Sequence, residues 1–159
     1  MISSLPFRIR IIGTGAEEYV GSLKALAESL GVAGKIEWLG HKADIYPFIT
    51  GSAAGVAPSV CTEAFGLTII EFMSQGIPVI ASDNGAQPEI ITSGVEGLLV
   101  PPGDAAALAG AMRRLIEDPS ARRDMGLAAR RKFITSFSFS RYFSKVQELY
   151  RRVLDSAVS

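Results

Sequence analysis

The chain has few of the residues on which redox and metal sites depend. Its 159 residues include one cysteine, Cys61, and one histidine, His41. A single cysteine excludes an internal disulfide and is typical of a reducing compartment, so we expect a cytoplasmic protein. One histidine gives no histidine-based zinc cluster and no serine-type triad. We expect no metal site, and we expect Cys61 to be a small buried residue rather than a reactive thiol.

Long apolar runs are also missing. Although 48% of the residues are hydrophobic, no uninterrupted apolar stretch approaches the roughly 18 residues that a membrane-spanning helix needs. The start, MISSLPFRIRII, carries its charges after the first apolar positions and has no small-residue cleavage site. It therefore does not resemble a secretion signal. The length predicts a single domain over residues 1–159.

The net charge is zero, but the charge is unevenly distributed. Between residues 113 and 155 the chain carries eleven Lys or Arg residues and five Asp or Glu residues. A basic excess can mark contact with an anionic membrane or with nucleic acid. No aromatic platform for bases lies among these charges, so we expect no nucleic-acid partner. A solvated helix face is the default interpretation, and peripheral contact with a membrane is the alternative.

Strand-like and helix-like segments alternate along the whole chain, which predicts an α/β fold. Its expected form is a Rossmann-like parallel sheet with helices on both faces. The expected strands lie near residues 7–13, 35–41, 55–58, 77–82 and 97–101. The expected helices lie near residues 17–30, 43–51, 67–75, 87–93, 105–117, 119–132 and 139–155.

A glycine pair follows the first expected strand. Gly13 and Gly15 match the start of a dinucleotide-binding turn, but the third glycine of that fingerprint would fall on Glu18. A carboxylate at that position would repel a pyrophosphate, so a dehydrogenase is not expected.

Two glutamates, Glu63 and Glu71, bracket the run EAFGLTIIE. A Phe-Gly turn follows the first, and a helix is expected to begin near Leu67. Free amides at a helix start attract phosphate, and a carboxylate beside them can accept two hydrogen bonds from a sugar diol. The combination suits a sugar nucleotide, although the spacing alone also arises by chance on amphipathic segments.

The order of the motifs resembles one family. The Pro-Ser loop of GVAPSV, the Glu-x7-Glu run, IPVIAS, Pro88-Glu89 and GLLVPPGD follow one another along the chain. This series is similar to the C-terminal, donor-binding half of retaining GT-B glycosyltransferases, the group 1 family. The ordered series is more specific than any of its pieces, and the resemblance runs from the first expected strand to the last helix.

The resemblance implies a role for each residue of the run. Glu63, at the catalytic centre, would hydrogen-bond a hydroxyl of the donor sugar. Thr68 would bind a diphosphate oxygen, and Glu71 would hold the two ribose hydroxyls. The backbone amides that would meet other sugar hydroxyls belong to Phe65, Gly66 and Leu67. The implied reaction moves a hexose from a nucleoside-diphosphate sugar to an acceptor, with retention at the anomeric carbon and without a metal or other cofactor.

Two parts of the family pattern have no counterpart in the sequence. The family's first strand of this half, with an Arg and a Lys that clamp the diphosphate, is missing, as is the N-terminal acceptor domain. We expect this chain alone to be inactive, with a sheet that closes abnormally or associates with another copy. Two alternatives remain: a non-catalytic module that binds a nucleotide sugar or a partner, and a phosphorylase or sugar-nucleotide epimerase on the same scaffold.

Overall fold

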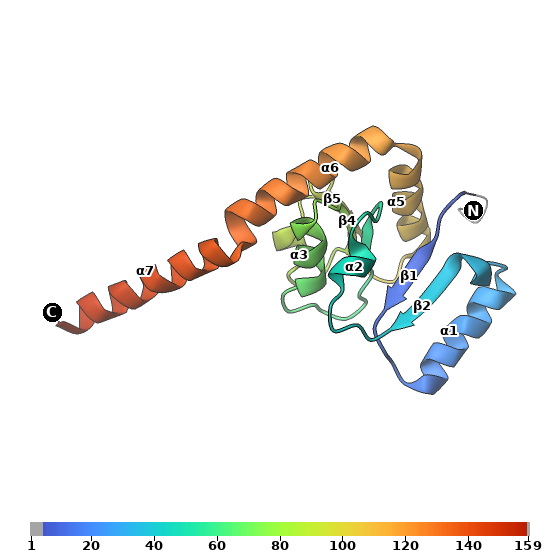
Figure 1. Ribbon diagram of the computed structural model, residues 1–159, viewed down its shortest axis with the longest axis horizontal. Helices are drawn as coiled ribbons and strands as arrows, with labels where there is room; N and C mark the ends of the chain where they lie inside the picture. The colour runs from blue at the N-terminus through green and yellow to red at the C-terminus, as the bar shows by residue number, and fades with distance from the viewer. Residues whose placement is uncertain (1–4, 159) are drawn as a thin grey trace. The chain divides into compact units, whose positions relative to one another are not determined.

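The computed structural model describes residues 5–158. Contacts between residues divide the chain into two compact units, Met1–Ser52 and Ala53–Ser159. Figure 1 shows the elements of both, with the first unit in blue to cyan and the second in cyan to red. The single domain expected from the chain length stays a prediction.

The first unit is a two-stranded parallel sheet with its crossover helix. Its elements are β1 (Ile9–Ile12), α1 (Glu17–Ser29), the 3-10 helix η2 (Ala33–Lys35), β2 (Ile36–Gly40) and α2 (Tyr46–Ile49). β1 pairs with β2 in parallel, with Ile9 opposite Ile36. The Arg10 side chain donates a hydrogen bond of 2.8 Å to the carbonyl of Phe48. Arg10 thus joins β1 to α2 inside this unit.

The second unit contains a three-stranded parallel sheet in the order β3-β4-β5. Its strands are β3 (Gly55–Ala57), β4 (Val79–Ser82) and β5 (Gly97–Val100). Its helical elements are α3 (Leu67–Ser74), α4 (Gln87–Ile90), α5 (Ala105–Glu117), α6 (Pro119–Lys132), the π-helical turn η3 (Phe133–Phe137) and α7 (Phe139–Val158). The expected parallel α/β architecture is confirmed, with its strands divided between two sheets.

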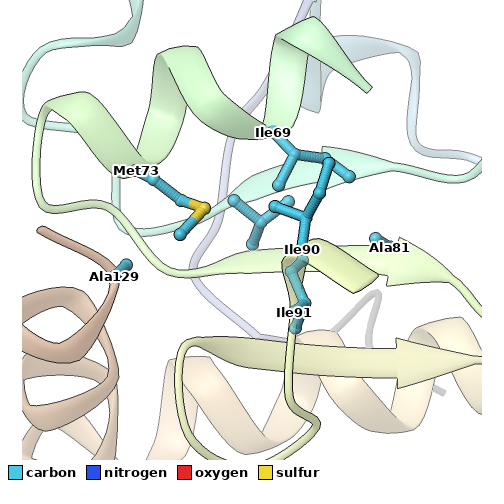
Figure 2. Packing of buried hydrophobic residues seen from close by; sticks show 7 residues of the cluster. Ile69, Met73, Ala81, Ile90, Ile91 and Ala129 are labelled. Carbon is cyan, nitrogen blue, oxygen red and sulfur yellow. The ribbon is translucent and has the colours of Figure 1, made fainter. Parts of the chain in front are cut away.

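The core of the second unit forms on both faces of β4. All four residues of β4 are buried, and successive side chains of a strand point to opposite faces. Val79 and Ala81 accordingly pack in a cluster with Ile69 and Met73 of α3 (Figure 2). On the other face, Ile80 packs with four residues from β5, α5 and α6: Leu98, Val100, Leu115 and Met125. This two-sided burial is typical of a central parallel strand.

α3 and α6 approach closely where two glycines meet. A Cβ built on Gly126 would lie 2.3 Å from the carbonyl oxygen of Gly76, so α6 can pass this turn only because residue 126 has no side chain. The Arg130 guanidinium also donates to the carbonyl of Ser74 at the end of α3. These contacts fix α3, and with it the start of that helix.

Each sheet ends in a strand with a free edge. Among residues 5–158, β1 pairs only with β2 and β3 pairs only with β4. No described strand pairs with both β1 and β3. Within the same residues, no helix is both long and apolar enough to span a bilayer.

Candidate functional site

A cavity of about 380 Å³ lies in the second unit, beside the end of β3 and the start of α3. Ligands of parallel α/β sheets bind beyond the carboxyl ends of the strands, and the cavity has this position. Residues singled out from the sequence make up much of its wall: Glu63, Phe65, Gly66, Leu67 and Thr68. These five residues of the run EAFGLTIIE therefore line one cavity in the structure.

The start of α3 leaves backbone amides without partners. Gly66 precedes the helix with a φ of 81°, and no side chain of the described residues caps the helix. The first amide to bond is that of Ile69, which donates to the Gly66 carbonyl at 3.0 Å. The amides of Leu67 and Thr68 have no acceptor in the described part of the chain. Because both residues line the cavity, the helix start can accept an anion there.

The loop after β4 contacts the backbone of the turn at Glu63. The Ala86 amide donates to the Glu63 carbonyl at 2.9 Å. A Cβ on Gly85 would lie only 2.3 Å from the same oxygen, and Gly85 has a φ of 52°. Only glycine tolerates both the close approach and the left-handed backbone. The position of Glu63 thus depends on a segment more than twenty residues further along the chain.

Asn84 extends this support to the Pro-Ser loop. Its side-chain amide donates to the carbonyl of Ser59 at 3.0 Å and to that of Cys61 at 3.2 Å. The prediction that Cys61 is buried was wrong, because its side chain is exposed. The backbone of this residue, rather than its thiol, makes the structural contact that keeps the turn in place.

Glu71 is the one predicted site residue that does not line the cavity. It lies one turn beyond Leu67 on α3, and burial raises the pKa of its carboxyl above the usual 4.5. A carboxylate that loses water without gaining a partner is destabilised in its charged form. Ligand hydroxyls that donated to it would supply the missing hydrogen bonds.

Gln87 is a cavity residue that the sequence did not single out. It is 1% exposed and lines the cavity, and its side-chain oxygen has no hydrogen-bond partner among residues 5–158. The sequence from Asn84 to Glu89 predicts a loop that leads into a helix. Nothing in that local pattern indicates that the glutamine packs beneath a distant turn.

Among the described residues, no group of three His, Cys, Asp or Glu side chains could hold a metal ion. Transfer without a metal stays a prediction.

The chain matches known proteins over most of its length. A sequence profile of the family described as "Glycosyl transferases group 1" matches residues 4–132. The phosphatidyl-myo-inositol mannosyltransferase of Mycobacterium leprae is 32% identical over 151 residues, which are 94% of this chain and 39% of that protein. The alpha-maltose-1-phosphate synthase of Mycolicibacterium smegmatis is 34% identical over 146 residues, which are 87% of this chain and 37% of that protein.

A solved structure shows the same fold. HepE from Anabaena, crystallised with UDP, superposes with a TM-score of 0.89 at 26% identity and covers 95% of this chain. HepE has also been solved in complex with UDP-glucose. The match involves 43% of the HepE chain, so this chain spans about two fifths of the length of its relatives. The chain therefore belongs to the group 1 glycosyl transferases and corresponds to the C-terminal part of a GT-B fold.

Proposed function

We propose that this chain is the donor-binding half of a retaining glycosyltransferase, which moves a hexose from a nucleoside-diphosphate sugar to an acceptor. The observation that carries the proposal is that Glu63 and the uncapped start of α3 line one cavity. A diphosphate and a sugar need an anion site and a hydroxyl acceptor side by side. The complexes of HepE with UDP and UDP-glucose support this class of ligand.

Each residue around the cavity has a distinct task in this proposal. The Glu63 carboxylate accepts a hydrogen bond from a sugar hydroxyl, and the amides from Phe65 to Leu67 donate to neighbouring sugar oxygens. Thr68 donates to a diphosphate oxygen. Glu71, one turn further along α3, accepts from the two ribose hydroxyls, so the nucleotide extends along the helix away from the cavity wall.

The chemistry rests on stabilising a leaving group. When the bond between the anomeric carbon and the diphosphate breaks, negative charge grows on the diphosphate oxygen. Preorganised donors such as the Thr68 hydroxyl lower the energy of that charge. The acceptor hydroxyl then attacks from the face that the diphosphate leaves and gives its proton to the departing diphosphate oxygen, so the anomeric configuration is retained. No metal takes part in this scheme.

A calorimetric titration tests the binding part of the proposal. We expect the chain to bind one or more of UDP-glucose, GDP-mannose and ADP-glucose. Glu71→Ala should weaken the tightest of these by about 10- to 150-fold, because a hydrogen-bond set to a charged group contributes about 1.5–3 kcal/mol. Glu117→Ala, which removes an exposed carboxylate near the end of α5, is the matched control and should leave the affinity unchanged.

Two results would count against the proposal in different ways. If none of the three nucleotide sugars binds, the donor-site assignment is wrong. If one binds and Glu71→Ala binds equally well, the cavity stands as a donor site but the ribose role of Glu71 is lost.

The share of the relatives' length that this chain covers favours a second candidate for the isolated chain. With about two fifths of that length, it would act alone as a nucleotide-sugar-binding module. In this reading an N-terminal acceptor domain is the partner that makes the module an enzyme.

A further inference from the structure

The side chain of Gln87 buries a polar atom in the wall of the cavity. Gln87 is 1% exposed and lines the cavity together with Glu63 and the start of α3. Its side-chain oxygen has no hydrogen-bond partner among residues 5–158. A buried polar atom without a hydrogen bond destabilises a fold, and folded proteins contain few of them. The orphaned oxygen of Gln87 therefore indicates a partner from outside the chain.

Only the side chain of Gln87 lacks a partner, because its backbone is hydrogen-bonded on both sides. The Gln87 amide donates to the carbonyl of Asn84 at 3.2 Å, and the Gln87 carbonyl accepts from the amide of Ile91 at 2.9 Å. One turn further along α4, Ile90 packs in one cluster with Ile69 of α3 (Figure 2). This packing holds the glutamine near the start of α3, so its side chain cannot swing out to water without breaking it.

The cavity is the side from which a partner can reach the Gln87 side chain. A residue that is 1% exposed and still lines the cavity is enclosed by protein in the other directions. The end of a glutamine side chain carries an acceptor oxygen and a donor nitrogen, which are nearly equal in shape. A half turn of this amide exchanges the two atoms. The amide can therefore pair with a hydroxyl, which both donates and accepts.

The surroundings of Gln87 favour the sugar part of a ligand. Gln87 directly follows Ala86, whose amide donates to the Glu63 carbonyl at 2.9 Å. The Glu63 carboxylate repels a phosphate and accepts a hydrogen bond from a hydroxyl. At about 380 Å³, the cavity lies at the small end of ligand pockets. It therefore has room for only part of a nucleotide sugar.

We propose that Gln87 is a specificity residue of the donor site, which hydrogen-bonds a second hydroxyl of the sugar that Glu63 binds. This inference rests on the proposed function. A sugar with hydroxyls within reach of both Glu63 and Gln87 satisfies the buried amide. A deoxy-sugar without the second hydroxyl leaves the amide unpaired, and a site built to hydrogen-bond a hydroxyl rejects an analogue that lacks it.

Calorimetric titration with two matched ligands tests the role of Gln87. The ligands are the tightest-binding of UDP-glucose, GDP-mannose and ADP-glucose, and the diphosphate of the same nucleoside without its sugar. Gln87→Met keeps the length of the side chain and removes the amide. Its affinity for the nucleotide sugar should fall by about 3- to 10-fold, the contribution of one neutral hydrogen bond. Its affinity for the diphosphate should equal that of the wild type.

Gln147→Met is the matched control. It makes the same change at an exposed position of α7, far along the chain from the cavity residues. Its affinities for the nucleotide sugar and for the diphosphate should both equal those of the wild type.

Thermal unfolding without ligand distinguishes sugar recognition from a structural role. An apolar side chain of similar shape in place of an unpartnered buried amide leaves the stability unchanged or raises it. Gln87→Met should therefore melt at or above the temperature of the wild type, as followed by circular dichroism. A glutamine that stabilises the fold through a hydrogen bond would give a variant that melts lower.

The failure of this inference differs from the failure of the proposed function. If the wild type binds none of the three nucleotide sugars, the donor site is wrong and the role of Gln87 is lost with it. If the wild type binds one and Gln87→Met keeps its full affinity, the donor site stands and the role of Gln87 is wrong. An equal loss for the nucleotide sugar and the diphosphate, or a variant that melts lower, also overturns that role.

Discussion

At the scale of single residues, the burial of Glu71 makes the stability of the fold depend on pH. Burial raises the pKa of its carboxyl above 4.5, so the folded chain holds this proton more tightly than the unfolded chain does. Stability from this group is therefore fully present below pH 4.5 and is lost as pH rises through the folded pKa. Ionisation of the Glu71 carboxyl therefore comes at a cost to the fold.

The first prediction follows from the cost of ionising the Glu71 carboxyl. Glu71→Gln should melt at a higher temperature than the wild type at pH 7, and the two melting curves should converge near pH 4. Thermal unfolding followed by circular dichroism at both pH values measures this. The exposed Glu117→Gln is the control and should show no such pH-dependent difference. A Glu71→Gln variant less stable than the wild type at pH 7 would contradict the desolvated environment.

The second residue-scale prediction concerns the support behind Glu63. Gly85→Ala should destabilise the chain and weaken nucleotide-sugar binding, because its Cβ would meet the Glu63 carbonyl at 2.3 Å. Left-handed alanine costs about 1–2 kcal/mol, and overpacking adds about 1–3 kcal/mol. Gly94 also has a positive φ, but a Cβ added there would meet nothing within 4 Å. The difference in unfolding free energy between Gly85→Ala and Gly94→Ala, measured by chemical denaturation, therefore gives the cost of the clash alone. Equal losses in both variants would mean that the Gly85 contact is unimportant.

At the scale of elements, the helix boundaries show what local sequence can specify. The predicted bounds of α5 and α6 agree with the structure. Asp104 caps α5 through a 2.8 Å bond to the Ala107 amide, and Asp118 caps α6 just before Pro119. Caps and prolines act within one turn of the chain, so these signals can be read from the sequence.

Other elements depended on contacts that the sequence does not reveal. The segment at 87–93 forms only a four-residue helix, and the turn η3 between α6 and α7 was not expected. At the site, the local run predicted five cavity residues, whereas the burial of Gln87 and the exposure of Cys61 depend on how distant loops pack. Tertiary packing decides such positions, and one sequence does not report it.

Two glycines within helices give the element-scale prediction. Gly126→Ala should destabilise the chain, because its Cβ would lie 2.3 Å from the Gly76 carbonyl in the packing of α6 on α3. Gly110→Ala in α5 meets nothing within 4 Å and should stabilise it by about 0.5–1 kcal/mol. Urea denaturation of both variants measures the two changes. If Gly126→Ala is also stabilising, α6 does not pack closely on α3 in solution.

At the scale of the whole molecule, the chain has a cavity at the start of α3 and spans about two fifths of the length of the relatives named above. We predict that the 159-residue chain binds a nucleotide sugar but transfers no sugar to any acceptor. Release of UDP, GDP or ADP from the matching donor, followed by chromatography, should stay at the level of a Glu63→Ala variant. Turnover above that level would contradict the prediction that this chain alone is inactive.

The central claim is that a donor diphosphate binds at the start of α3, and amide NMR during titration with the tightest-binding nucleotide sugar tests it most directly. The account predicts saturable shifts of the Leu67 and Thr68 amides, because these two donors lie beside the cavity and have no acceptor within the described part of the chain. Amides of α5, whose start Asp104 already caps, should not move. Shifts that spare Leu67 and Thr68 and cluster at α5 or elsewhere would contradict the account.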